Sequence, residues 1–230
     1  MAETAIKDPS SVLPRNWTET QFRELAAGAL HAAPSEDIFH PPNSGLIGNG
    51  DFDLNPHMAA ELDLEKPLRP AAVLVPIILR EQLTVLLTER SAHLPNHAGQ
   101  VAFPGGKIEK HDPDPLGAAL RESEEEIGLD RSFVEPFGYL DNYRTGTGFH
   151  VTPIVGLVKP EFTLKLDPSE VESSFEVPLE FLMSSGNHQL HTKELRGRKR
   201  VYYAMPYRER YIWGATAGMI KNLHDRIFQS

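Results

Sequence analysis

Four glutamates crowd into five consecutive positions shortly after a pair of glycines. They belong to the stretch FPGGKIEKHDPDPLGAALRESEEEIGLD, residues 103–130, and are Glu122, Glu124, Glu125 and Glu126. Like charges three or four residues apart on a helix repel one another, so this crowding costs stability unless something positive is nearby. Carboxylate oxygens are the ligands that Mg²⁺ and Mn²⁺ prefer. From spacing alone, a cation site and a solvated acidic face are equally good interpretations.

A helix is needed to bring these carboxylates together. Asp114 supplies an N-cap acceptor, Pro115 suits the first helical position, and Gly128 suits the C-cap. The pattern therefore predicts a helix over residues 115–127. Its core-facing stripe is expected to consist of Leu116, Ala119, Leu120, Ser123 and Ile127.

Two of the glutamates are expected on one flank of this stripe. Glu122 and Glu126 lie one turn apart there, whereas Glu125 lies further round, at the helical spacing that lets it pair with Arg121. A divalent cation bound by two or three of these carboxylates would relieve their repulsion. The preceding FPGG segment offers a loop whose backbone can approach a ligand closely.

The elements that must support this helix are read from hydrophobic patterns. Residues 71–79 and 83–88 are short β-rich runs joined by a polar link, which is typical of a hairpin. Further strands and a last helix are expected at residues 134–140, 151–158, 201–205 and 213–228. Strands and helices are interspersed, so the predicted class is α/β (α+β) with a mixed sheet.

The chain is expected to have two parts, an N-terminal appendage over residues 1–68 and a main domain over residues 69–230. Residues 40–57 are rich in Pro, Gly and Asn and indicate a loop. One helical pattern in the appendage begins at the N-cap Thr18, and we expect it to pack on the main domain or on a partner subunit. Its apolar stripe comprises Phe22, Leu25, Ala26 and Leu30.

Composition narrows the classes of function. The 230 residues carry a net charge of −9 and include no cysteine. Disulfides, thiolate metal sites and a cysteine nucleophile are therefore excluded, and the acidic balance argues against a nucleic-acid partner. No apolar run approaches the length of a membrane span, and residues 1–17 lack the layout of a signal peptide. We expect a cytoplasmic protein that binds neither membranes nor nucleic acids.

The glutamate helix and the loop before it resemble a known signature. Gly106 through Leu129 is similar to the Nudix box, which ends in R-E-U-x-E-E-x-G-U with U aliphatic and marks hydrolases of nucleoside diphosphates linked to another moiety. Ser123 departs from this pattern at an aliphatic position, and the loop is one residue longer, with Asp112 at its acidic position. The matching residues are Arg121, Glu122, Glu125, Glu126, Gly128 and Leu129.

A second motif resembles one branch of this family, the coenzyme A pyrophosphatases. Residues 86–106, LLTERSAHLPNHAGQVAFPGG, are similar to the upstream signature of that branch, and the resemblance covers about residues 70–227. Pro95 replaces the second arginine of the signature, which removes a cation and a donor. The matching residues are Leu86, Leu87, Thr88, Arg90, Ser91, Gly99, Phe103, Pro104, Gly105 and Gly106.

The resemblance implies a metal-dependent pyrophosphatase on the Nudix fold, a mixed β-sheet sandwiched between helices. Mg²⁺ or Mn²⁺ is the implied cofactor, with Glu122 and Glu126 as direct ligands and the carbonyl of Gly106 completing the shell. Glu125 would share the metal or act as the base, and Arg121 would orient a glutamate. Homodimers are common in this family, so a homodimer is a further expectation.

Substrate contacts are expected from residues around the two motifs. Arg90 and Phe103 belong to the upstream signature, and Arg144 precedes a glycine-rich loop suited to a substrate lip. His97, and equally His93, can be read as a phosphate contact or as a solvated loop histidine. The basic run RGRKR, residues 196–200, can be read as attracting an anionic tail such as a 3′-phosphate or as a solvated loop, and we expect the solvated loop. We expect the residues around Trp213 to pack in the core.

Three functions remain open on these grounds. The first is hydrolysis of coenzyme A or acyl-CoA to 3′,5′-ADP and (acyl-)4′-phosphopantetheine. The second is a broader nucleoside-diphosphate hydrolase acting on ADP-ribose or NADH, an alternative that Pro95 supports. The third is a Nudix-type domain that binds a ligand without hydrolysing it, which the presence of Glu122, Glu125 and Glu126 disfavours.

Overall fold

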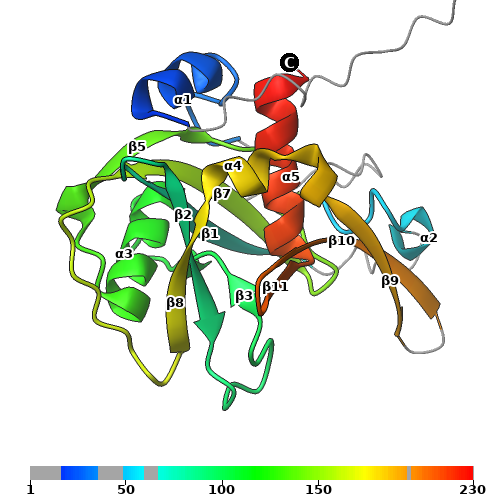
Figure 1. The fold of residues 1–230 in the computed structure, drawn as a ribbon. Helices are drawn as coiled ribbons and strands as arrows, with labels where there is room; N and C mark the ends of the chain where they lie inside the picture. Colours follow the sequence, from blue (N-terminus) through cyan, green and yellow to red (C-terminus); the bar gives the residue numbers. More distant parts are fainter. Residues whose placement is uncertain (1–16, 36–48, 60–66, 196–197, 230) are drawn as a thin grey trace, which may run out of the picture.

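The computed structural model describes residues 17–35, 49–59, 67–195 and 198–229. At its centre is a mixed β-sheet (Figure 1), in which β1 and β7 run parallel and the other neighbours pair antiparallel. The main path runs in the order β3 (Val101–Ala102), β2 (Thr84–Arg90), β1 (Arg69–Ile78), β7 (Phe149–Val158) and β5 (Val134–Tyr139). Three further strands pair with β1, β7 and β2 respectively: β4 (Gly105–Lys107), β6 (Tyr143–Arg144) and β8 (Val171–Pro178).

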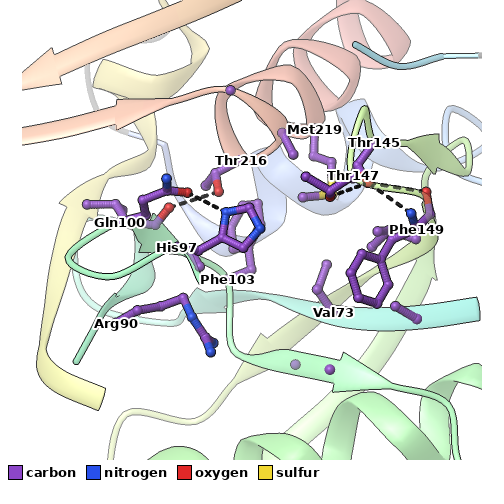
Figure 2. A pocket seen from close by; sticks show the side chains of 18 of the residues that line it. Val73, Arg90, His97, Gln100, Phe103, Thr145, Thr147, Phe149, Thr216 and Met219 are labelled. Atoms are coloured by element: carbon purple, nitrogen blue, oxygen red, sulfur yellow. Dashed lines mark hydrogen bonds between the residues drawn. The ribbon is translucent and has the colours of Figure 1, made fainter. Parts of the chain in front are cut away.

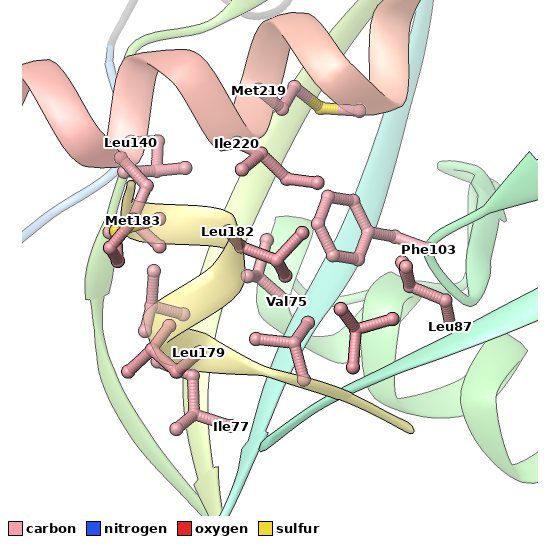
Figure 3. Packing of buried hydrophobic residues seen from close by; sticks show 14 of the residues in the cluster. Val75, Ile77, Leu87, Phe103, Leu140, Leu179, Leu182, Met183, Met219 and Ile220 are labelled. Carbon is pink, nitrogen blue, oxygen red and sulfur yellow. The ribbon is translucent and has the colours of Figure 1, made fainter. Parts of the chain in front are cut away.

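The side chains of β1 alternate between two hydrophobic clusters, because both faces of this strand are covered. On one face, Val75 and Ile77 pack with α4 (Leu179–Met183) and α5 (Ala215–Phe228), as Figure 3 shows. On the other face, Leu74 and Ile78 pack beneath α3 (Pro115–Ile127). The sheet is therefore sandwiched between helices, which confirms the predicted fold class.

Helix α3 has the bounds that the sequence predicts. The side chain of Asp114 accepts a hydrogen bond from the N–H of Gly117 at 2.7 Å, and Gly128 closes the helix with a φ of 67°. Its buried face, however, is rotated from the expected one: Leu116 and Leu120 are only half-buried. The face in contact with the sheet consists of Pro115, Ala118, Ala119, Ser123, Glu126 and Ile127.

This rotation has a packing reason and a consequence. Ala118 and Ala119 are both fully buried, and such small side chains let the helix approach the sheet closely. Ser123 is tolerated in the core because its hydroxyl donates to the carbonyl of Ala119 at 2.7 Å. The same rotation carries Glu126 from the expected flank into the buried face, where its carboxylate is 4% exposed.

A second, smaller sheet lies beside α5 (Figure 1). It has the strand order β11 (Arg210–Trp213), β10 (Arg198–Tyr207) and β9 (Gln189–Leu195), all antiparallel. The predicted strand at 201–205 is the middle of β10, whereas β8, β9 and β11 were not expected. Short 3₁₀ turns lie at Arg131–Phe133 and Ser185–Asn187.

The described part of the N-terminal region packs on this body. Thr18 caps α1 (Glu19–Ala26) with a capping box, and Trp17 and Phe22 belong to the main hydrophobic cluster. The helix ends at Ala26, earlier than expected, and Leu25 is 40% exposed rather than packed. The predicted loop 40–57 is wrong at its end, because a short helix, α2 (Pro56–Ala59), begins there; residues 40–48 of that loop lie outside the described residues. Within the described part, no helix is long and apolar enough to cross a membrane.

Candidate active site

A cavity of about 680 Å³ lies between the β2–β4 segment, the 145–149 turn and the start of α5. Figure 2 looks into it, with His97, Gln100 and Thr216 on one side and Val73 and Phe149 on the other. Its acidic lining residues are Asp51, Glu109, Glu122, Glu126 and Glu170, and its basic ones are Arg90, Lys107 and Arg200. Apolar walls with both signs of charge suit a nucleotide-like ligand better than a purely apolar one.

Glu126 is the most deeply buried acid of this cavity. Its Oε2 accepts a hydrogen bond from the N–H of Gly105 at 3.0 Å, and its Oε1 lies 3.5 Å from Nη1 of Arg90. Burial raises the pKa of Glu126 to about 7, and the charges of Glu122 and Glu170 add to the rise, although Gly105 and Arg90 oppose it. The site therefore resists a full negative charge on this carboxylate.

Glu122 lines the same cavity one turn earlier on α3. Burial raises its pKa, and the neighbouring Arg121, at 2.9 Å from its Oε1, lowers it. The backbone of β4 passes directly over this carboxylate, because a Cβ built on Gly106 would lie 2.5 Å from its carboxyl carbon. A glycine is thus required at position 106 if Glu122 is to keep its position.

Arg121 fixes the outer side of the glutamate cluster. Its Nε and Nη2 donate to the two oxygens of Asp112 at 2.9 Å and 3.0 Å, while its Nη1 donates to Glu122 and, at 2.8 Å, to Glu125. Hydrogen bonding to Arg121 holds the pKa of Asp112 below its usual range. Arg121 and Glu125 do not belong to the described lining of the cavity, and the side chain of Glu125 is 59% exposed.

The substrate residues expected from the sequence are only partly brought together. Arg90, His97 and Phe103 line the cavity, and the ring of His97 is held by Gln100 at 2.9 Å. Arg144 does not line it, because its guanidinium packs over the ring of Phe52, 5.7 Å from the centroid. The glycine-rich loop after Arg144 reaches the cavity through other residues, Thr145 and Thr147. His93 and Pro95 are exposed and are not among the described lining residues.

Sequence reasoning missed several residues of the cavity wall. Arg200, from the basic run expected to be a solvated loop, lies on β10 and faces the cavity; residues 196–197 of that run are outside the described part. Trp213, expected in the core, is half-buried and also lines the cavity. Asp51 and Glu170 complete the set. Asp51, Glu170 and Trp213 come from segments far from the box, and the sequence around them carries no local signal that predicts their place. For Arg200 the basic run was the available signal, and the solvated-loop interpretation was preferred to it.

The carboxylate pair fits a divalent cation. Glu122 and Glu126 supply hard oxygen donors, and both have raised pKa values with burial as the largest cause. Within the described part of the chain, no three His, Asp or Glu side chains gather as a metal cluster. A cation held here would therefore complete its shell with backbone carbonyl oxygen or water, as Mg²⁺ commonly does.

Comparison with known proteins identifies the family of this chain. The model of the NUDIX domain matches residues 68–196. The uncharacterized Nudix hydrolase NudL of Escherichia coli (strain K12) is 42% identical over 155 residues, which are 67% of this chain and 81% of NudL.

Solved structures of other members are more distant. The Ap4A hydrolase of C. elegans, in a binary complex, is 23% identical over 48% of this chain and 80% of its own, with a TM-score of 0.40. The NUDIX domain of Shewanella oneidensis NrtR, complexed with ADP ribose, is 21% identical over 54% and 83%, with a TM-score of 0.40. The family assignment therefore rests on the domain match and on NudL, and by these the chain belongs to the Nudix hydrolases, enzymes that act on the pyrophosphate bonds of nucleotide derivatives.

Proposed function

We propose that this Nudix hydrolase cleaves the pyrophosphate linkage of coenzyme A or acyl-CoA, releasing 3′,5′-ADP and (acyl-)4′-phosphopantetheine. One observation carries the proposal. The segment that resembles the coenzyme A pyrophosphatase signature, residues 86–106, folds into the cavity wall that faces the glutamates of α3. The residues that it contributes to this wall include Arg90, His97, Phe103, Gly105 and Gly106.

The chemistry begins from the charge of a diphosphate, whose oxygens repel an incoming nucleophile. Mg²⁺ or Mn²⁺, when bound by Glu122, Glu126 and the carbonyl of Gly106, would neutralise those oxygens and lower the pKa of a bound water. In the reaction, water adds to one phosphorus and the bond from that phosphorus to the bridging oxygen breaks. The products are two phosphomonoesters, each of which receives one proton of the water. Each loses that proton to solvent above its second pKa, which is about 6.

The side chains around the carboxylates have supporting parts in this scheme. Arg121 holds Glu122 in one orientation through a 2.9 Å hydrogen bond. Arg90 lies at the cavity wall 3.5 Å from Glu126, where its charge can also meet a substrate phosphate. Glu125 lies on the outer side of the cluster and accepts a hydrogen bond from Arg121. We therefore propose that it helps to hold the cluster in place and does not act as the base.

The apolar wall supports a substrate with more than a diphosphate. Beside the charged groups, the cavity is lined by aliphatic and aromatic side chains, which include Val73, Phe103, Phe149, Val151 and Met219. Such walls contribute affinity for an adenine ring or an aliphatic arm, because they remove apolar surface from water. ADP-ribose and NADH share the adenine and the diphosphate, so they are the competing substrates.

Product chromatography tests the proposal. The purified protein is incubated with Mg²⁺ or Mn²⁺ and, separately, with coenzyme A, ADP-ribose and NADH. We expect 3′,5′-ADP to be released from coenzyme A well ahead of turnover of the other two. Preference for ADP-ribose or NADH would leave the Nudix chemistry in place and refute the substrate. No turnover of any of the three would refute the proposed activity on this group of substrates.

A further inference from the structure

Arg200 is a cation of the cavity wall that neither the Nudix box nor the upstream signature explains. It lies on β10, outside the residues 68–196 that match the family model, and its side chain is 23% exposed. Its neighbour Lys199 is exposed and is not among the described lining residues, as expected for adjacent residues of a strand, which point to opposite faces. Burying a guanidinium in a cavity is unfavourable unless a partner or a ligand compensates the lost hydration.

Asp51 is the partner that fixes this guanidinium. Nη2 of Arg200 donates to Oδ2 of Asp51, a carboxylate that is 8% exposed. Asp51 also accepts from the hydroxyl of Tyr143 at 3.0 Å and from the N–H of Gly146 at 2.7 Å. Burial and the charge of Asp51 raise the pKa of Tyr143, so its hydroxyl stays a donor. The carboxylate is therefore held from three sides, and it holds Arg200 in one place.

This network is not needed to attach the N-terminal segment to β10. Asn55 already does so, because its amide donates to the carbonyl of Val201 at 2.7 Å and accepts from the N–H of Val201 at 2.8 Å. The strand is thus pinned one residue after Arg200 by a neutral side chain that is fully buried. A buried ion pair adds little stability in such a place, which leaves the charge of Arg200 available for a role toward a ligand.

The surroundings of Arg200 suit a phosphate. The N–H of Gly146 places the 145–148 turn beside the same carboxylate, and Thr145 and Thr147 on either side of Gly146 both line the cavity. In the part of the chain that the structure describes, the guanidinium of Arg200 donates to Asp51, and Arg200 lines the cavity, so its remaining N–H groups are available to a ligand there. The hydroxyls of Thr145 and Thr147 lie 3.0 Å from one another, and the hydroxyl of Thr145 also accepts from the N–H of Phe149. A cation beside a turn that carries such hydroxyls is a common environment for phosphate oxygens.

This group lies at a different end of the cavity from the glutamates. Gly105, which donates to Glu126, pairs with Val73 of β1, whereas the turn before Phe149 lies at Arg69 of the same strand. Four residues of strand separate the two positions, about 13 Å along β1. This separation is one of backbone positions, and the long side chains of Arg200 and the glutamates line the cavity between them. An anion at Arg200 would therefore be a different group from the diphosphate that is cleaved at the glutamates, about one ribose away from it.

We propose that Arg200, positioned by Asp51, binds a second phosphate of the substrate, distinct from the diphosphate, and thereby selects nucleotides that carry a phosphomonoester on the ribose. The inference rests on the proposed function, for which this group is the 3′-phosphate of coenzyme A. Arg200 is a specificity-determining residue that contacts substrate, and Asp51 is a positioning residue that acts through it.

The test compares coenzyme A with 3′-dephospho-coenzyme A, which differs only in the phosphate at issue. Steady-state kcat/KM is measured with Mg²⁺ for the wild type, Arg200→Ala, Arg200→Lys, Asp51→Asn and the matched control Lys199→Ala. Circular dichroism and thermal melts verify that each variant is folded. The control removes the same charge from the same strand outside the cavity lining.

We expect the wild type to prefer coenzyme A, and Arg200→Ala to lower kcat/KM for coenzyme A about 10- to 100-fold, through KM, with dephospho-coenzyme A unchanged. Arg200→Lys should restore part of the preference, Asp51→Asn should weaken it, and Lys199→Ala should retain it. The inference is overturned if Arg200→Ala lowers kcat/KM equally for coenzyme A and dephospho-coenzyme A. It is also overturned if the wild type has the same kcat/KM for both substrates. In either case the proposed function stands. A wild type that hydrolyses ADP-ribose and neither coenzyme overturns the proposed function, and the inference with it.

Discussion

Replacing Glu126 by Gln should stabilise the metal-free protein at alkaline pH and remove its response to Mg²⁺. Glu126 is 4% exposed, and burial raises its pKa from an ordinary value of 4.5 to about 7. A folded-state pKa above the unfolded value means that ionisation opposes folding. The stabilisation that protonated Glu126 gives the folded protein is therefore fully present below the pKa of the unfolded state. It is lost as the pH rises through the pKa of the folded state.

The size of the effect follows from this shift. The difference between 4.5 and about 7 corresponds to about 3 kcal/mol of unfolding free energy. About 2.5 kcal/mol of this should be lost between about pH 5 and about pH 8, the window in which the folded-state carboxyl ionises. Gln does not ionise, and its carbonyl oxygen can still accept from the N–H of Gly105. The stability of the variant relative to the wild type should therefore rise by that amount across the window.

Urea denaturation in the presence of a chelator, at about pH 5 and about pH 8, measures this difference. Repeating the alkaline measurement with Mg²⁺ should stabilise the wild type, because the cation binds the folded state only, and should leave the variant unchanged. Hydrolytic turnover of the variant should fall sharply. Glu124→Gln is the matched control on the same helix. Hydrogen bonding to Arg131 lowers the pKa of Glu124, so this substitution should not stabilise the protein at alkaline pH.

Two results would refute this reasoning. A free-energy difference between Glu126→Gln and the wild type that is constant across the window would mean that the carboxyl ionises as easily in the folded protein as in the unfolded chain. A Glu126→Gln variant that is stabilised by Mg²⁺ as strongly as the wild type would mean that this residue does not hold the cation.

Three further substitutions probe the glutamate helix and the core. Gly106→Ala places a methyl group 2.5 Å from the carboxyl carbon of Glu122, so Mg²⁺-dependent turnover should fall at least about 10-fold; turnover equal to the wild type would show that this close approach is not needed. Arg121→Ala frees Glu122 and should lower kcat about 10- to 100-fold with a small change in thermal stability; an unchanged kcat in a folded variant would contradict the orienting role. Trp17→Ala removes a fully buried ring that packs edge-to-face on Phe228 at 5.8 Å and should cost about 3–5 kcal/mol in urea denaturation; a loss below about 1 kcal/mol would mean that α1 is not part of the cooperative core.

Local features of the chain were predicted from sequence because their causes are local. The cap of α3 is a hydrogen bond between Asp114 and the N–H three residues later, and its C-terminal end needs only the left-handed conformation of Gly128. The hairpin of β1 and β2 was predicted from two apolar runs joined by a short link. In the structure the two strands pair antiparallel, with Ile77 opposite Val85. The last helix, expected over residues 213–228, is likewise found as α5 (Ala215–Phe228).

Only those residues of the candidate site that belong to the two sequence motifs were predicted. The box brought Glu122 and Glu126 to one cavity, and the upstream signature brought Arg90, His97 and Phe103 to the same place. The rotation of α3 was not predictable from its own stripe, because it depends on how closely two alanines let the helix approach the sheet. For this reason the depth of Glu126, and hence its raised pKa, emerged only in the folded chain.

By itself, the sequence determined helix α3, the last helix, the strands of the hairpin, the acidic box and the loop that precedes it. Only the tertiary structure decided that Asp51 meets Arg200, a residue 149 positions away, and that Thr145 and Thr147 reach the cavity in place of Arg144. The physical reason is the range of the interactions. Caps, turns and periodicity act within a few residues, whereas a cavity wall is assembled from strand pairings and buried charges whose partners the chain brings together only when it folds.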